Sequence, residues 1–144
     1  MSTPTCELCT GPGGRLLYDD GRLRVVIVDE ADYPGFVRVI WNAHVREMTD
    51  LMPADRAHLM QVVFTVEQVQ RQVLAPHKMN VASLGNVTPH LHWHLIPRFA
   101  DDAHFPAPIW AERRRTLPDA VAAGRRAQVP ALIDALVSEL AGSR

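Results

Sequence analysis

Residues 89–97 read Pro89-His-Leu-His-Trp-His-Leu-Ile-Pro97 and are the most informative segment of the chain. Their three histidines, His90, His92 and His94, alternate with apolar residues, which is the period of a β-strand. We therefore expect a strand over residues 90–98 with the three imidazoles on one face. Imidazoles packed together must stay mostly neutral and find hydrogen-bond partners. The pattern thus indicates a functional site rather than an ordinary polar face.

The composition is that of a globular protein. The chain has 144 residues, of which 47% are hydrophobic and 22% are charged, so we expect a single domain over residues 1–144. Its formal net charge of −1 provides no overall field that would attract nucleic acid or an anionic membrane. No segment is long and apolar enough to cross a bilayer. The first residues lack the features of a signal peptide, so we expect a cytoplasmic protein.

The rest of the sequence predicts an α+β fold. Strands are expected over residues 16–18, 23–28, 36–41 and 79–84, and Asp19-Asp20-Gly21 is a hairpin signal between the first two. A long helix is expected over residues 54–74, because Pro53 suits a first helical position and the apolar residues that follow have the 3.6 period. A last amphipathic helix is expected over residues 130–141. Mostly antiparallel strands with one long inserted helix are typical of α+β proteins.

Two kinds of chemistry fit three histidines on one face. One is a nucleophilic imidazole that attacks a phosphate, assisted by its neighbours. The other is a metal-dependent hydrolase in which all three rings bind one catalytic ion that activates water. The segments around the histidines contain no acidic base for the second mechanism, which favours the first.

The segment His90-Leu-His92-Trp-His94-Leu-Ile96 resembles the His-x-His-x-His-x-x signature (x apolar) of the histidine triad, or HIT, family. The order of hairpin, Pro-Gly turn, strand, long helix and triad strand also resembles that family. The resemblance covers residues 5–105 and leaves a Pro- and Arg-rich tail with a helix, residues 106–144, outside it. It implies a HIT-like sheet of about five antiparallel strands, a homodimer and a nucleotide substrate.

HIT proteins hydrolyse or transfer nucleotides at the α-phosphate, so the resemblance implies phosphoramidate or dinucleoside polyphosphate substrates. It implies that His92 is the nucleophile and forms a covalent nucleotidyl-imidazole, with no cofactor for catalysis. A backbone carbonyl or a neighbouring ring can fix the required tautomer of His92. His94 would hydrogen-bond the phosphate or protonate the leaving oxygen. His90 would support His92 or belong to a separate site.

Four further residues match substrate-binding positions of the family. Asp29 aligns with the residue that accepts hydrogen bonds from the ribose hydroxyls, and Asn86 lies in the loop that faces the phosphate. Asn80 matches a strand residue near the nucleotide, and Arg98 would meet phosphate oxygens. Each also has an ordinary interpretation as a loop, turn or exposed strand-end residue.

Cys6 and Cys9 form a Cys-x-x-Cys pair, and in one branch of the HIT family such a pair completes a zinc site. The resemblance implies that the other two ligands are His44 and His90. Two thiolates and two imidazoles make a closed tetrahedral set of the structural type. The alternative is a pair of half-buried thiols without metal.

Two departures from the family bear on turnover. Phe36 stands where HIT proteins usually have His, and the loop between Asn80 and His90 is short. These changes raise a third hypothesis, a nucleotide-binding module with little turnover.

Overall fold

A computed structural model describes residues 3–142. Its five strands form one antiparallel sheet in the order β1-β2-β3-β5-β4. Their bounds are Arg15–Asp19 for β1, Leu23–Ile27 for β2, Val37–Trp41 for β3, Lys78–Ala82 for β4 and His92–Arg98 for β5. The expected α+β fold, with a five-stranded antiparallel sheet, one long helix and a C-terminal helix, is confirmed.

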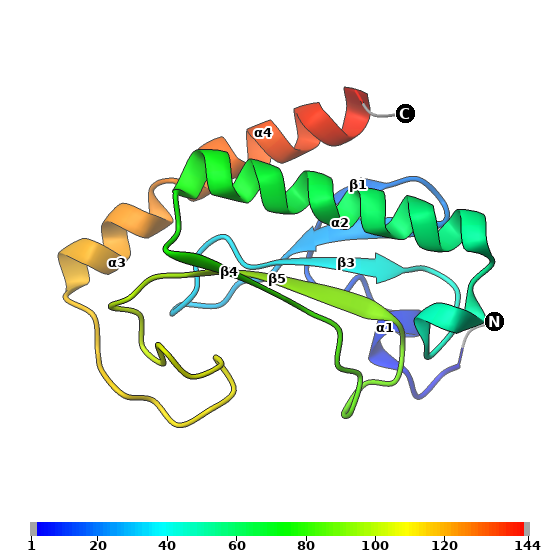
Figure 1. Ribbon diagram of the computed structural model, residues 1–144, viewed down its shortest axis with the longest axis horizontal. Helices are drawn as coiled ribbons and strands as arrows, with labels where there is room; N and C mark the ends of the chain where they lie inside the picture. The colour runs from blue at the N-terminus through cyan, green and yellow to red at the C-terminus, as the bar shows by residue number, and fades with distance from the viewer. Residues whose placement is uncertain (1–2, 143–144) are drawn as a thin grey trace.

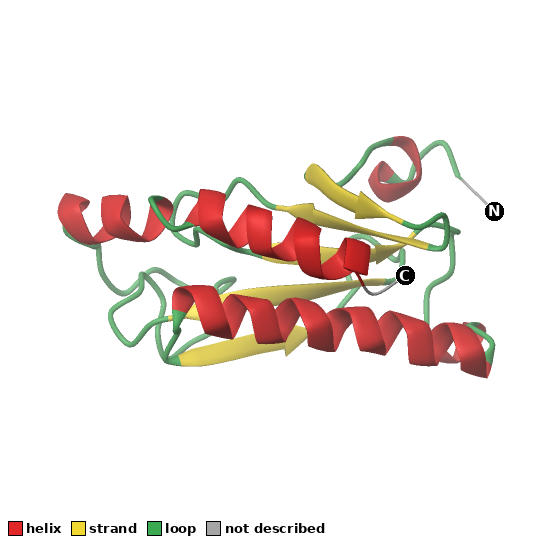
Figure 2. Cartoon of the chain, turned by 90° about the horizontal axis from the view of Figure 1, so that it is seen from above, coloured by secondary structure: helices red, strands yellow, loops and turns green. Residues whose placement is uncertain are grey.

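The helices divide between the two faces of the sheet. The long helix α2 (Pro53–Leu74) and the last helix α4 (Val129–Gly142) lie side by side over one face (Figures 1 and 2). The short helix α1 (Glu7–Thr10) and the segment between β5 and α3 (Asp119–Arg126) lie on the other side of the sheet (Figure 1). A 3₁₀ turn, Met48–Asp50, precedes α2. One face therefore carries the helical layer, and the other stays accessible for a site.

The main core lies between the sheet and the helical layer. Helix α2 begins at Pro53, one residue before the predicted start, and ends where Ala75 takes a left-handed conformation (φ 47°). Leu59, Val63 and Val66 of α2 are completely buried in one cluster with sheet residues such as Val25, Val39 and Leu95. Full burial of each such side chain stabilises the fold by about 1.5–3 kcal/mol. This packing holds the middle of β5, which carries two of the three histidines.

The triad strand is shorter than predicted, because β5 begins at His92 rather than His90. Pro89 has no N–H to donate to a sheet, and the His90 N–H donates to the carbonyl of Thr88 at 2.8 Å. Residues 88–90 therefore form a turn. The backbone pairing resumes only where the Trp41 N–H donates to the carbonyl of Leu91.

Helix α3 is an element that the sequence did not predict. It is only eight residues long and none of its residues is buried, so it does not offer the long apolar stripe that marks α2 and α4. Of the helices in residues 3–142, none is both long enough and apolar enough to span a membrane.

Candidate active site and metal centre

The ring of His92 is held by the backbone beside it. Its Nδ1 lies 2.5 Å from the carbonyl oxygen of His90. Because a carbonyl only accepts hydrogen bonds, Nδ1 carries the proton and donates it. The other nitrogen, Nε2, then keeps its lone pair. This is the tautomer that a nucleophilic imidazole needs.

His94 is the neighbour of His92 on the same face of β5. The two ring centroids lie 4.8 Å apart at an interplanar angle of 80°. His94 is buried, and its Nδ1 has no hydrogen-bond partner within the described residues. Burial, followed by the fields of His92 and Arg38, lowers the pKa of His94 to about 3. Burial likewise lowers the pKa of His92, so both rings are neutral at pH 7.

A hollow of about 460 Å³ opens in front of these two rings. It is lined by His92, His94 and Arg38 from the sheet, Glu7 and Leu8 from α1, residues 84–88 of the loop before β5, and Trp110. Its size suits a small ligand. Of the expected substrate-binding residues, the structure brings Asn86 to this hollow.

Asp29 lies elsewhere, at a second and larger hollow of about 720 Å³. That hollow is lined by residues that follow β2, such as Glu30, together with Arg126 of α3 and Ile133 of α4. The structure therefore does not bring Asp29 to the hollow that contains His92 and His94.

Arg98 and Asn80 form part of a buried network. The Arg98 guanidinium donates from Nε to Asp102 Oδ2 at 2.8 Å and from Nη2 to Asp102 Oδ1 at 3.0 Å. It also donates to Asn80 Oδ1 at 2.7 Å and to the carbonyl of Ala107 at 2.7 Å. Arg98 is only 1% exposed, so its donors are engaged inside the protein. The geometry gives Arg98 and Asn80 the role of holding the segment after β5.

Arg38 and Trp110 are among the residues of the hollow that were missed in the sequence. The ring of Trp110 lies 5.2 Å from that of His94, edge to face, and 54% of the residue is exposed. No local pattern predicts this contact, because it depends on the path of the segment after β5. Arg38 could have been noticed in the sequence, because it is a charged residue within the otherwise apolar strand β3.

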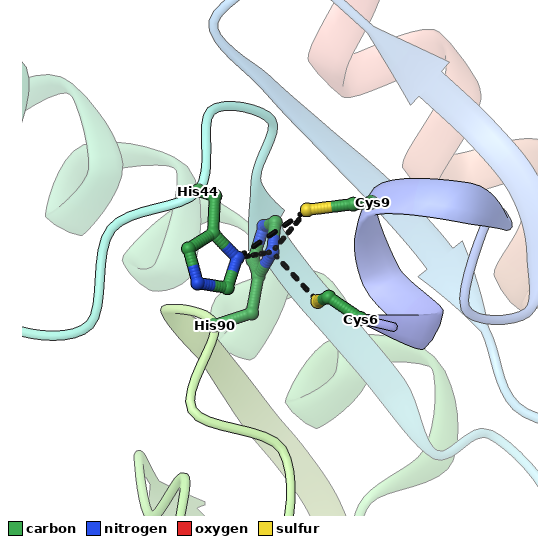
Figure 3. Close-up of side chains that lie close together, drawn as sticks. All are labelled: Cys6, Cys9, His44 and His90. Atoms are coloured by element: carbon green, nitrogen blue, oxygen red, sulfur yellow. Dashed lines mark hydrogen bonds between the residues drawn. The ribbon is translucent and has the colours of Figure 1, made fainter. Parts of the chain in front are cut away.

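The remaining histidine of the motif, His90, which comes first in the sequence, belongs to a separate cluster. Figure 3 shows its ring with Cys6, Cys9 and His44. Cys6 directly precedes α1, Cys9 lies in α1, and His44 lies in the loop after β3. His90 Nδ1 lies 3.4 Å from Cys6 Sγ, 3.5 Å from Cys9 Sγ and 3.3 Å from His44 Nδ1. Cys9 Sγ lies 3.3 Å from His44 Nδ1. One ligand atom from each of the four lies within 4.8 Å of the others.

These separations fit a tetrahedral zinc ion. Zinc bonds of about 2.3 Å to sulfur and about 2.0–2.1 Å to nitrogen set nitrogen–nitrogen separations of about 3.3 Å and sulfur–nitrogen separations of about 3.6 Å. His90 Nε2 donates to the carbonyl of Trp41 at 2.6 Å, which leaves Nδ1 free of a proton and available as a ligand. The four residues are therefore able to hold zinc.

A family model described as the HIT domain matches residues 13–101, more than half of the chain. The chain belongs to the HIT family. The resemblance found in the triad motif is thereby confirmed.

Among solved structures, a histidine triad protein from Bradyrhizobium japonicum is 27% identical, with a TM-score of 0.71, and the match covers 89% of this chain and 91% of that one. A zinc-bound HIT family protein from Mycobacterium smegmatis shares the fold at 21% identity, with a TM-score of 0.63 and coverage of 97% and 98%. Both agree with the sheet described above.

A curated relative, the AP-4-A phosphorylase of Mycobacterium tuberculosis, is 32% identical over 92 residues. The match covers 59% of this chain, and the chain spans about half (47%) of the length of that relative. The HIT domain and this relative support a nucleotide-processing enzyme in general terms.

Proposed function

We propose that this HIT protein hydrolyses or transfers a nucleotidyl group at the α-phosphate of a nucleotide, with His92 as the nucleophile. The observation that carries the proposal is the hydrogen bond from His92 Nδ1 to the carbonyl of His90, which leaves Nε2 as the basic nitrogen. The hollow in front of His92 has room for the phosphate.

The reaction has two steps. In the first, the Nε2 lone pair of His92 attacks the α-phosphorus, and the bond from phosphorus to the leaving group breaks with its electron pair on that group. A leaving phosphate needs no added proton at pH 7, whereas an amine takes its proton from water. The imidazole becomes a cation that keeps its Nδ1 proton, and the carbonyl of His90 stabilises this charge through a charge-assisted hydrogen bond.

In the second step, an acceptor attacks the same phosphorus and releases His92 Nε2. Water as acceptor gives the nucleoside monophosphate and loses a proton to the solvent, and inorganic phosphate gives the nucleoside diphosphate. His94 is neutral at pH 7 and has one N–H, which donates a hydrogen bond to the phosphate or the departing atom. Asn86 lines the same hollow and is a second donor toward the phosphate.

The substrate that we propose is a dinucleoside polyphosphate or a nucleotide phosphoramidate. The AP-4-A phosphorylase relative supports the first of these. Asp29 remains a predicted ribose contact, to be tested by comparing ribose and 2′-deoxyribose substrates.

We also propose that Cys6, Cys9, His44 and His90 bind a structural zinc ion. The fit of their ligand atoms supports this, as does the zinc-bound family member from M. smegmatis. Four protein ligands close the coordination shell and leave no position for a substrate. The ion would tie α1 to the residues around His90, whose carbonyl orients His92.

The alternative of one catalytic ion on all three histidines has less support. Within residues 3–142, His92 and His94 belong to no group of three or more ligand side chains. His90 faces the cysteines instead.

The test is mass spectrometry of the protein mixed briefly with an adenosine phosphoramidate or with diadenosine tetraphosphate. We expect a nucleotidyl adduct on the wild-type protein that is absent from His92→Ala. The matched control is His77→Ala, since His77 is exposed and does not line the hollow of His92 and His94. Undiminished turnover in His92→Ala would overturn the nucleophile assignment, and binding without an adduct or product would favour the binding module.

A further inference from the structure

Arg38 lies beside the two catalytic histidines. Strand β3 pairs with β5 so that Arg38 stands directly opposite His94, and Ile40 stands opposite His92. Residues opposite each other in an antiparallel pair project to the same face, with their Cβ atoms about 4.5–5.5 Å apart. Arg38 accordingly lines the same hollow as His92 and His94.

The guanidinium of Arg38 is only partly satisfied by the protein. Its Nε is buried and has no hydrogen-bond partner among residues 3–142. The one hydrogen bond found for its side chain in that range runs from Nη1 to the carbonyl of Gly13, at 3.0 Å. None of the ion pairs within the described residues includes Arg38.

Arg38 is half-buried, and two buried arginines provide a comparison. Arg98 is paired with Asp102 through two hydrogen bonds. Arg24 donates to the side chain of Asn42 and to three carbonyl oxygens, those of Pro12, Leu8 and Gly11. Desolvating a cation without compensating partners is unfavourable. The Arg38 guanidinium carbon lies 5.6 Å from the centre of the Phe36 ring, but within residues 3–142 Arg38 has no anionic partner.

We propose that Arg38 binds the phosphate that His92 attacks, through guanidinium N–H groups on the side that lines the hollow. A guanidinium is planar and always charged, and its N–H groups match the oxygens of a phosphate. The positive charge would reduce the repulsion between the negative phosphate and the attacking lone pair of His92. It would also stabilise the negative charge that develops on the phosphate oxygens in the transition state. The ligand class is therefore a nucleoside 5′-phosphate, and this inference rests on the proposed function.

Glu7 is the acidic residue among those that line the hollow. Its Oε1 accepts a hydrogen bond from Thr88 Oγ1 at 3.0 Å. A carboxylate at the rim attracts the Arg38 charge but lies in no ion pair with it in the described structure. Because the Glu7 carboxylate does not pair with Arg38, the guanidinium remains available to the phosphate.

The test compares the affinities for AMP and for adenosine, measured by calorimetry. We expect the wild-type protein to prefer AMP, and Arg38→Gln to lose about 10–100-fold of AMP affinity with little change for adenosine. Arg38→Lys should recover part of the loss. Arg71→Gln is the matched control, because Arg71 is exposed on α2, on the other face of the sheet. AMP binding by a folded Arg38→Gln variant at wild-type strength would overturn the proposal.

A second measurement uses the unmodified sequence and does not depend on how well a variant folds. Phenylglyoxal labelling of Arg38, located by peptide mass spectrometry, should be suppressed by AMP and not by adenosine. Equal labelling with both ligands would overturn the proposal. These experiments separate the two inferences, because AMP binding through Arg38 can be observed even if the wild-type protein forms no nucleotidyl adduct and the proposed function fails. If the adduct does form, Arg38→Gln should slow its formation about 10²–10³-fold.

Discussion

Arg98 and Asp102 form a buried ion pair that joins the end of β5 to the segment after it. Nε of Arg98 lies 2.8 Å from Asp102 Oδ2, and both side chains are at most 2% exposed. Asp102 also accepts hydrogen bonds from the N–H groups of Phe99, His104 and Phe105. The pair therefore sets the path of residues 99–115, which places Trp110 against His94.

Removing the carboxylate should destabilise the protein strongly. In Asp102→Ala the guanidinium of Arg98 would stay buried without its counter-charge, so we expect a loss of about 3–5 kcal/mol in the free energy of unfolding. Urea denaturation measures it. The neighbouring Asp101→Ala is the control, because Asp101 is 57% exposed in its ion pair with Arg125 and should contribute at most about 1 kcal/mol. Equal losses would contradict this account of the network.

Trp110 should contribute to the low pKa of His94. Burial is the main cause of that pKa, which lies at about 3, and the indole packs against the ring. In Trp110→Ala water would reach His94, so we expect its pKa to rise toward the ordinary value of 6.5. NMR titration of the imidazole resonances measures the shift. Val87→Ala, which changes a 95% exposed residue of the same hollow, should leave the pKa of His94 unchanged.

Stability should decrease as the pH falls from about 6.5 toward 3. The folded-state pKa of His94 is about 3, below its unfolded value of about 6.5, so the unfolded state takes up the proton first. The contribution of His94 is therefore fully present above pH 6.5. Below that it is lost by at most about 1.4 kcal/mol per pH unit. Urea unfolding at several pH values should show a shallower dependence for His94→Gln, and identical slopes would contradict the assignment.

Zinc binding should depend on the cysteines. We expect one zinc ion per chain by elemental mass spectrometry, its loss in Cys9→Ser, and a lower Tm after loss or chelation, because an ion that binds only the folded state stabilises it. His77→Ala should keep the metal. Nucleotidyl transfer to His92 should continue in chelated protein at temperatures where it stays folded. Loss of activity without loss of folding would instead favour the catalytic-metal hypothesis.

The free edge of β4 provides a test of the homodimer expected from the family. Within the described residues β4 pairs only with β5, while Val81 of β4 and Phe64 of α2 are 37% and 55% exposed. We expect light scattering to give twice the mass of one chain, and Val81→Lys to shift the protein toward the monomer. Val137→Lys, which changes a 41% exposed residue of α4, is the control. A monomeric wild-type protein would refute the expectation.

Much of the fold is visible in local patterns. The 3.6 period and Pro53 predicted α2 to within one residue at its start, because an amphipathic helix repeats its buried face along a continuous segment. The alternation around His92 and His94 predicted a strand with both rings on one face for the same kind of reason. Helix α3 escaped prediction because it buries none of its residues.

The site divides in the same way. The order of residues along the chain was enough to predict the triad and, through the family resemblance, the set of Cys6, Cys9, His44 and His90. The structure decided that the carbonyl of His90, rather than a neighbouring ring, fixes the tautomer of His92. Only the tertiary structure decided that Arg98 holds the segment after β5 and that Trp110 contacts His94. It also decided that Arg38 has no ion-pair partner within the described residues. These features depend on which distant groups meet in space. A hydrogen-bond partner many residues away, or the lack of one, leaves no periodic trace in the sequence.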